Sequence, residues 1–396
     1  MNKSELIVGL DIGTTKICAV VGELSESGLV DVVGIGTSVS TGLRKGVVVN
    51  IEQTVQSIRK AVEDAELMAG CEIHSVYVGI AGSHIMGINS HGVIAVKGGE
   101  VAQRDIERAL DAARAVAIPA DREVIHILPQ EYIVDNQRGI ADPLGMAGVR
   151  LEVKVHIVTG AVSSAQNIVR SCHRSQLEVA DIALESLASA KAVLTEEERE
   201  IGVALVDLGG GTTDIAVLSL GGKVKATSVR VAGNHYDEEI LKFVRNKFSI
   251  AIGQRTAENL KKNVACCPQK ADFNETMEIK GRSLLTGLPV RVNVSTADLY
   301  EPVMRLSEQI GTAAHQVLEK TPPELAGDIY RNGVMLTGGG AQLHGLTEYL
   351  SQELKVEVTV SPDPVNCVAL GTAMSLGVRD KLETGFTDAT PRIGRR

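Results

Sequence analysis

Two short stretches of this sequence repeat the same combination of aspartate, glycine and threonine. Residues 7–24 read IVGLDIGTTKICAVVGEL and residues 203–220 read VALVDLGGGTTDIAVLSL, so Asp11 and Asp207 each begin the repeated phrase. Both phrases interrupt an apolar, strand-like run, which predicts a tight turn between two strands. Glycine in such a turn lets backbone N–H groups approach an anion, and threonine hydroxyls add donors. A carboxylate at the end of the first strand can hold Mg²⁺ together with water and phosphate oxygens.

A single turn of this kind is weak evidence, because a glycine-rich β-hairpin without a ligand explains one copy about as well. Two copies favour a phosphate site, since similar halves that pack face to face bring both turns to one cleft. We therefore expect the turns at 11–16 and 207–214 to enclose a di- or triphosphate. No G-K-[ST] sequence occurs, so a Walker A phosphate loop is excluded.

A third glycine cluster, LTGGG at residues 336–340, ends an apolar strand and precedes a predicted helix. Small residues at this position let a nucleoside lie against the backbone near a helix N-terminus. A plain strand-to-helix turn is the alternative interpretation. With the two phosphate turns in place, we favour the nucleoside.

Composition and charge narrow the class of protein. The net charge is −9, and the only arginine cluster is at residues 392–396, which argues against the concentrated basic face that nucleic acid binding requires. The cysteines and histidines show no C-x-x-C or H-E-x-x-H spacing, so we expect free thiols in a reducing cytoplasm and no zinc site. We find no signal peptide and no apolar run of membrane-spanning length, and we expect a cytoplasmic protein.

The order of predicted elements indicates an α/β protein with two similar halves. The chain begins with three strand-like runs, a helix from Ile51 to a C-cap at Gly70, and a strand at 76–82. Residues 83–157 have the character of an insertion. Aromatic residues make up only 3% of the chain, and a core of Val, Ile, Leu and Ala fits buried parallel sheets covered by helices.

The three glycine phrases, in this order and spacing, resemble those of the actin–Hsp70–sugar kinase superfamily of ATPases. The likeness extends over nearly the whole chain. Up to about residue 230 the chain is similar to the FtsA family of division proteins, on stretches such as HILPQEYIVDNQRGIADPLGMAGVRLEVKVHIVTG and ALESLASAKAVL. From there on, VAGNHYDEEILKFVRNKF and VMLTGGGAQLHGLTEYL are similar to the MreB family.

This resemblance implies a fold and a division into subdomains. The fold is the two-lobed actin-like ATPase fold, in which ribonuclease-H-like domains are duplicated, with an FtsA-type 1C insertion and a second small subdomain. The implied parts are lobe I (1A) at 1–82 and 158–198, the 1C-like insertion at 83–157, lobe II (2A) at 199–235 and 295–368, a small 2B-like subdomain at 236–294, and a return helix with a tail at 369–396.

The resemblance also implies roles for individual residues. Asp11 and Asp207 would hold Mg²⁺ through water, and Glu185 would orient the attacking water in ATP hydrolysis. The alternative to a catalytic role for Glu185 is that its carboxylate caps a helix. The alternative to nucleotide binding by Glu258 and Lys261 is that they form an ordinary exposed i,i+3 pair on a helix. The implied nucleotide-binding residues are Gly13, Thr14, Thr15 and Lys16 in the first phosphate loop, Gly209, Gly210, Gly211, Thr212 and Thr213 in the second, Glu258 and Lys261 beside the ribose and adenine, and Gly233, Gly338, Gly339 and Gly340 along the nucleoside.

The implied function is that of an ATP-binding bacterial actin homologue of cell division, which forms head-to-tail filaments and hydrolyses ATP slowly. Its implied partners are copies of itself, FtsZ and other divisome proteins. An MreB-like filament for cell shape or organelle positioning is the main alternative, and a small-molecule kinase on the same fold is another. A third alternative is a scaffold protein that binds ATP and barely hydrolyses it.

The end of the sequence bears on membrane attachment. FtsA proteins end in a basic amphipathic helix that holds them to the membrane. Residues 381–396, KLETGFTDATPRIGRR, contain a proline, two glycines and hardly any apolar face, so they do not predict such a helix. We expect attachment to the inner face of the cell membrane only through a segment missing from this chain or through a partner.

Overall fold

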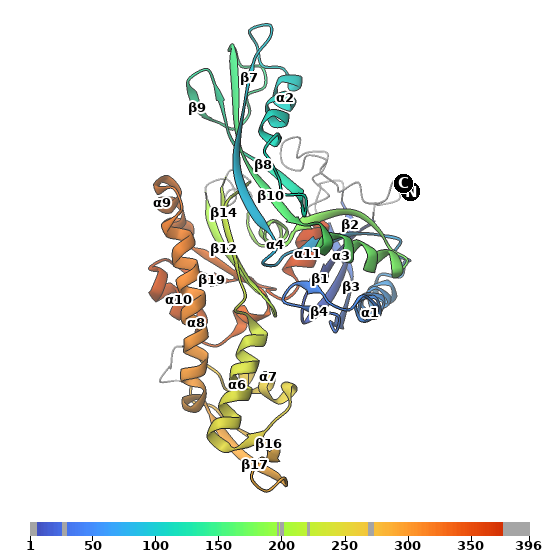
Figure 1. The fold of residues 1–396 in the computed structure, drawn as a ribbon, viewed down its shortest axis with the longest axis vertical. Coiled ribbons are helices and arrows are strands. Elements are labelled where there is room, and N and C mark those ends of the chain that lie inside the picture. Colours follow the sequence, from blue (N-terminus) through green and yellow to red (C-terminus); the bar gives the residue numbers. More distant parts are fainter. Residues whose placement is uncertain are drawn as a thin grey trace.

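The computed structural model describes residues 6–25, 30–195, 198, 202–219, 222–267 and 273–374. Its centre consists of two five-stranded sheets (Figure 1). The first sheet contains β1 (Leu6–Ile12), β2 (Lys16–Leu24), β3 (Val30–Val39), β6 (Ser75–Ile80) and β11 (Glu178–Leu184). The second sheet contains β12 (Val203–Leu208), β13 (Thr213–Ser219), β14 (Gly222–Val229), β18 (Val334–Thr337) and β19 (Val358–Val360).

The two sheets share one topology. The strand order is β3-β2-β1-β6-β11 in the first and β14-β13-β12-β18-β19 in the second. In each, the three strands that come first in the chain are antiparallel, and the two later strands run parallel to the first one. The duplication predicted from the repeated phrase is therefore present in the fold.

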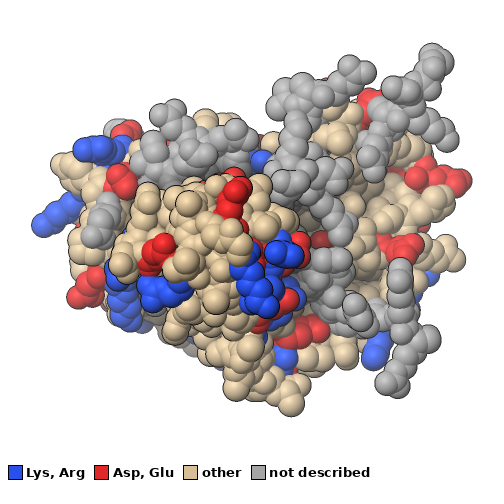
Figure 2. Space-filling view, turned by 90° about the horizontal axis from the view of Figure 1, so that it is seen from above, with Lys and Arg blue, Asp and Glu red and all other residues tan. Residues whose placement is uncertain are grey.

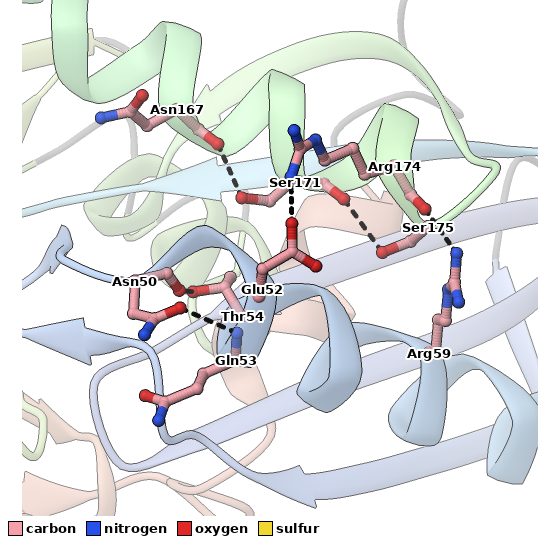
Figure 3. Close-up of polar contacts among 9 residues, drawn as sticks. All are labelled: Asn50, Glu52, Gln53, Thr54, Arg59, Asn167, Ser171, Arg174 and Ser175. Atoms are coloured by element: carbon pink, nitrogen blue, oxygen red, sulfur yellow. Dashed lines mark hydrogen bonds and ion pairs between the residues drawn. The ribbon is translucent and has the colours of Figure 1, made fainter.

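Helices cover the first sheet and join it to the second. They are α1 (Ile51–Ala69), α3 (Val162–Arg174), α4 (Glu185–Val193) and α11 (Cys367–Met374). The side chain of Asn50 caps α1 by accepting from the N–H of Gln53, and Gly70 ends it with φ 68°. Arg174 of α3 pairs with Glu52 of α1 and so ties the two helices together (Figure 3).

The second sheet is covered by α8 (Thr296–Glu319), α9 (Pro323–Asn332) and α10 (Leu346–Leu354), and its β18 leads into a short 3-10 turn, η1 (Gly339–Gln342). Helix α6 (Gly233–Phe248) follows β14 and extends away from this sheet (Figure 1). The long helix α8 begins with a capping box between Ser295 and Asp298. The predicted helix after the third glycine cluster is thus only one 3-10 turn, and α10 starts later.

Two smaller sheets extend the molecule at opposite ends of its long axis (Figure 1). We call the first the inserted subdomain; it consists of β7 (Met86–Ala95), α2 (Gln103–Arg114), β8 (Arg122–Val134), β9 (Gln137–Ile140) and β10 (Arg150–Ala161). The other sheet, near α7 (Gln254–Asn263), consists of β15 (Ile250–Ala251), β16 (Thr276–Ser283) and β17 (Pro289–Ser295). A short hairpin, β4 (Leu43–Arg44) and β5 (Val47–Val48), precedes α1.

Charges of both signs are interspersed on the face shown in Figure 2. Within the described ranges, no helix combines the length and the apolar character needed to cross a membrane. Of the expected return helix and tail, α11 is described up to Met374. The stretch 381–396 and its arginines lie outside the described residues.

Candidate functional site

The two repeated phrases form equivalent turns in equivalent places. Asp11 is the next-to-last residue of β1, and Asp207 is the next-to-last residue of β12. Each strand then turns back through glycine and threonine residues into its antiparallel partner. We call residues 13–15 the first loop and residues 209–212 the second loop.

The two loops touch each other. A Cβ atom added to Gly210 would lie 1.7 Å from Oγ1 of Thr15, and one added to Gly211 would lie 2.5 Å from Oγ1 of Thr14. A larger residue at either position would force the loops apart or turn the threonine side chain away. The close contact between the loops explains why glycine occupies positions 210 and 211.

A cavity of about 710 Å³ opens between the loops. This volume is within the usual range for small-molecule sites. Of the residues predicted to bind nucleotide or act in hydrolysis, all except Thr213 line it. The lining members are Asp11, Gly13, Thr14, Thr15, Lys16, Glu185, Asp207, Gly209, Gly210, Gly211, Thr212, Gly233, Glu258, Lys261, Gly338, Gly339 and Gly340.

Thr213 differs from its neighbour because successive residues of a strand point to opposite faces. Thr212 faces the cavity, and its hydroxyl donates to Oδ2 of Asp214 at 3.0 Å. Thr213 is fully buried, and its hydroxyl donates to the carbonyl oxygen of Val231 at 2.5 Å. The Thr213 hydroxyl therefore anchors β13 and does not line the cavity, and its role in nucleotide binding stays a prediction.

Three carboxyl groups line the cavity close together: Asp11 and Asp207, which are buried, and Glu185, which is half-buried. Burial raises the pKa of Asp11 to about 6, partly offset by Lys16. Burial, and then the charges of Asp214 and Asp11, raise the pKa of Asp207 to about 7. Burial and the neighbouring aspartates also raise the pKa of Glu185 well above its ordinary value. A cation or a set of donors brought among these groups would relieve their mutual repulsion.

The start of α6 is hydrogen-bonded to the second loop. The N–H of Gly233 donates to the carbonyl oxygen of Gly209 at 3.0 Å, and the N–H of Asn234 donates to that of Gly210 at 2.9 Å. The hydroxyl of Thr15 in the first loop donates to Oδ1 of Asn234 at 3.3 Å. The first turn of α6 thus holds both loops in register.

The two predicted residues of α7 have different partners. Lys261 contacts the two carboxylate oxygens of Asp237 at 2.9 and 3.0 Å and donates to the carbonyl oxygen of Gly233 at 3.0 Å. Glu258 pairs with Lys262 at 2.7 Å on the more exposed side of the helix. Glu258 and Lys261 therefore do not form an i,i+3 pair with each other.

Lys16 joins the first loop to a distant part of the chain. Its Nζ donates to the carbonyl oxygen of Val365 at 2.9 Å and to Oδ1 of Asn366 at 2.7 Å. The same segment holds the third glycine cluster, because the N–H of Gly338 donates to the carbonyl oxygen of Pro364 at 2.7 Å. Gly338 has φ 80°, a conformation that favours glycine.

Several lining residues were not predicted from the sequence. Asn234 follows Gly233 directly and Asp237 lies about one helical turn later, so the predicted glycine at a helix start was a signal that could have found them. The others carry no motif of their own. They include Gly46, Gln254, Lys262, Gln342, His344, Pro364 and Val365.

Two family models match the chain. The model described as "MreB/Mbl protein" matches residues 165–384, and the "SHS2 domain inserted in FTSA" matches residues 82–159. Among solved structures, MreB5 of Spiroplasma citri bound to ADP is 22% identical, with a TM-score of 0.65 over 95% of this chain and 98% of that one. A chain of the MamK double helical filament is 15% identical, with a TM-score of 0.54 over 93% and 97%. These neighbours confirm the actin-like fold.

Sequence relatives are closer. The cell division protein FtsA of Pseudomonas aeruginosa is 47% identical over 357 residues, which is 89% of this chain and 82% of the relative. FtsA of Escherichia coli K12 is 35% identical over 373 residues, 92% of this chain and 86% of the relative. These matches extend well beyond residue 230, so the likeness to FtsA continues where the sequence alone pointed to MreB. The chain belongs to the FtsA family and is an FtsA-like cell-division actin homologue.

Proposed function

We propose that the cavity between the two loops binds ATP with Mg²⁺ and that slow hydrolysis there controls self-assembly during cell division. The observation that carries this proposal is the meeting of two equivalent turns at one cavity of about 710 Å³. The solved MreB5 structures described as bound to ADP and AMPPNP support it, because they share this fold.

The backbone N–H groups and hydroxyls of the two loops hold the phosphates in this proposal. Lys16 adds a positive charge at the side of the first loop. The glycines at 338–340 leave room for the nucleoside, since a Cβ at Gly339 would meet nothing within 4 Å. Glu258 and Lys261 flank the ribose and adenine from α7.

The carboxyl groups at the base of the cavity fit a divalent cation. Asp11 and Asp207 both have pKa values raised by burial, so a nearby positive charge would stabilise their ionised forms. No three His, Cys, Asp or Glu side chains in the described part of the chain are arranged to hold a metal ion. Mg²⁺ held through water and phosphate oxygens suits this arrangement, and it would neutralise the charge that develops on the phosphates.

Glu185 is the residue that we assign to the attacking water. It lines the cavity from the first turn of α4, and its carboxylate can accept a hydrogen bond from a water molecule and so orient it. Catalysis of phosphoryl transfer depends mainly on such positioning and on charge stabilisation.

Head-to-tail filaments, with FtsZ and other divisome proteins as partners at the inner face of the cell membrane, complete the proposal. The FtsA relatives support a role in division over one in cell shape. The MamK neighbour, described as a double helical filament, supports self-assembly.

Sedimentation and negative-stain imaging with Mg-ATP test this function. We expect ordered polymers from the wild-type chain, none from Asp207→Ala, and normal nucleotide binding with slower phosphate release from Glu185→Gln. Protein that stays monodisperse with Mg-ATP at high concentration over a range of salt would contradict self-assembly. Unchanged phosphate release in Glu185→Gln would contradict the role of Glu185.

A further inference from the structure

A histidine from the inserted subdomain binds the last amide of β11. The N–H of Leu184 donates to Nε2 of His126 on β8, with 3.0 Å between the nitrogens. Both residues are only 3% exposed. Because β11 is the edge strand of the first sheet, His126 supplies the acceptor that a further strand would otherwise provide.

This hydrogen bond lies one residue before Glu185. Leu184 is the N-cap of α4, and its side chain has no acceptor for the free N–H groups of the first turn. On its other side, Leu184 pairs with Ile80 of β6. The backbone that carries Glu185 is therefore fixed between a strand of the first sheet and a side chain of the inserted subdomain.

Packing does not fix this turn of α4 on all sides. A small cavity of about 80 Å³ lies beside it, lined by Leu184 and Ser186 and by residues of β7, β10, β13 and β14. The Ser186 hydroxyl is buried and finds no hydrogen-bond partner among the described residues. Well-packed interiors restrict movement and cavities do not. The bond to His126 therefore adds a restraint on this turn to the pairing of Leu184 with Ile80, on the side where the small cavity leaves the turn without close packing.

We propose that His126 is a positioning residue for Glu185, through which the inserted subdomain sets the rate of ATP hydrolysis. This rests on the proposed function, because it takes Glu185 to orient the attacking water. His126 is absent from the lining of the large cavity, so its effect on hydrolysis is indirect. To accept from Leu184, its ring must present an unprotonated Nε2.

Three substitutions on β8 separate this role from general stability. His126→Phe keeps a ring without an acceptor, and His126→Gln keeps an acceptor. Tyr132→Phe removes another buried polar group from the same strand, a hydroxyl without a hydrogen-bond partner in the part of the chain that the structure describes. We expect His126→Phe to lower kcat by roughly tenfold to a hundredfold, as small misplacements of catalytic groups do, with KM nearly unchanged. We expect His126→Gln to restore much of the rate and Tyr132→Phe to leave it unaffected.

Hydrogen exchange at the Leu184 amide gives a second readout that requires no activity. We expect slow exchange in the wild type, faster exchange in His126→Phe and slow exchange again in His126→Gln. If His126→Phe does not fold, hydrogen exchange at the Leu184 amide of the wild type still tests the proposal, because fast exchange there would overturn it. Equal kcat in His126→Phe and wild type would overturn it too. Wild-type protein without ATP turnover would contradict the proposed function alone, and the exchange rates would still test the restraint.

Discussion

Ser189 on α4 donates a hydrogen bond to Asp207 at the end of β12, with 3.1 Å between Ser189 Oγ and Asp207 Oδ2. Glu185 lies about one turn earlier on the same helix. The helix also packs tightly against α11, because a Cβ added to Gly371 would lie 1.7 Å from the carbonyl oxygen of Ala188. A single helix therefore holds both the proposed water-orienting carboxyl and a donor to the second aspartate.

Replacing Ser189 by alanine should weaken this arrangement. The Asp207 carboxylate would lose a donor while staying buried, which costs about 1–3 kcal/mol in the free energy of unfolding. Its pKa would rise further, because the hydrogen bond from Ser189 lowers it. Chemical denaturation and Mg-ATP titration measure both effects. Ser186→Ala on the same helix is the matched control and should change little, since no described residue forms a hydrogen bond with that hydroxyl. Equal losses in the two variants would argue against the Ser189 bond.

Gly210→Ala should separate the two loops. The new methyl group would overlap Oγ1 of Thr15, so either the loops move apart or Thr15 turns away. We expect nucleotide affinity to fall by roughly tenfold or more, as for other small misplacements in preorganised sites. Gly327→Ala on α9, where a Cβ meets nothing within 4 Å, should keep wild-type affinity. Fluorescent ADP binding compares the two, and unchanged affinity in Gly210→Ala would show that loop contact is dispensable.

The repeated phrase was enough to predict that two equivalent turns meet at one cavity, because backbone turns with two aspartates and several glycines are encoded locally. The sequence also predicted the duplicated sheets. It could not predict that Lys16 binds Val365 and Asn366, since that contact depends on how α11 returns to the first sheet. The sequence could not predict that the Thr213 side chain is buried, because the direction of a side chain at a strand start follows from register, which the motif does not contain.

The stability of the nucleotide-free protein should fall as pH rises. Asp11 and Asp207 have pKa values of about 6 and about 7, against 3.8 ordinarily. Between the ordinary pKa of 3.8 and these raised values, the folded chain keeps protons that the unfolded chain has released. The free energy of unfolding therefore decreases as the pH rises through this window. Thermal melts from about pH 5 to about pH 8 measure the slope. Asp207→Asn should flatten it, and added Mg²⁺ should stabilise the wild type more at the higher pH. An identical slope in Asp207→Asn would refute this assignment.

Replacing the neighbouring lysines 261 and 262 of α7 by methionine should lower the free energy of unfolding by very different amounts. Lys261→Met leaves the Asp237 carboxyl buried without its cation, and breaking such pairs costs about 2 kcal/mol or more. Lys262→Met removes only the pair with Glu258, whose two side chains are 62% and 38% exposed, so its cost is at most about 1 kcal/mol. Urea denaturation of both variants tests this difference. Similar losses would mean that the contact between Lys261 and Asp237 contributes little.

Calorimetric titration with ADP and Mg²⁺ tests most directly whether the two loops form a single nucleotide site. The wild type should bind one nucleotide per chain, and Asp11→Ala and Asp207→Ala should each abolish most of the affinity although they lie in different sheets. The double variant should be little worse than either single one, because the groups act on the same ligand. Binding that survives either substitution, or two independent sites per chain, would contradict the shared site.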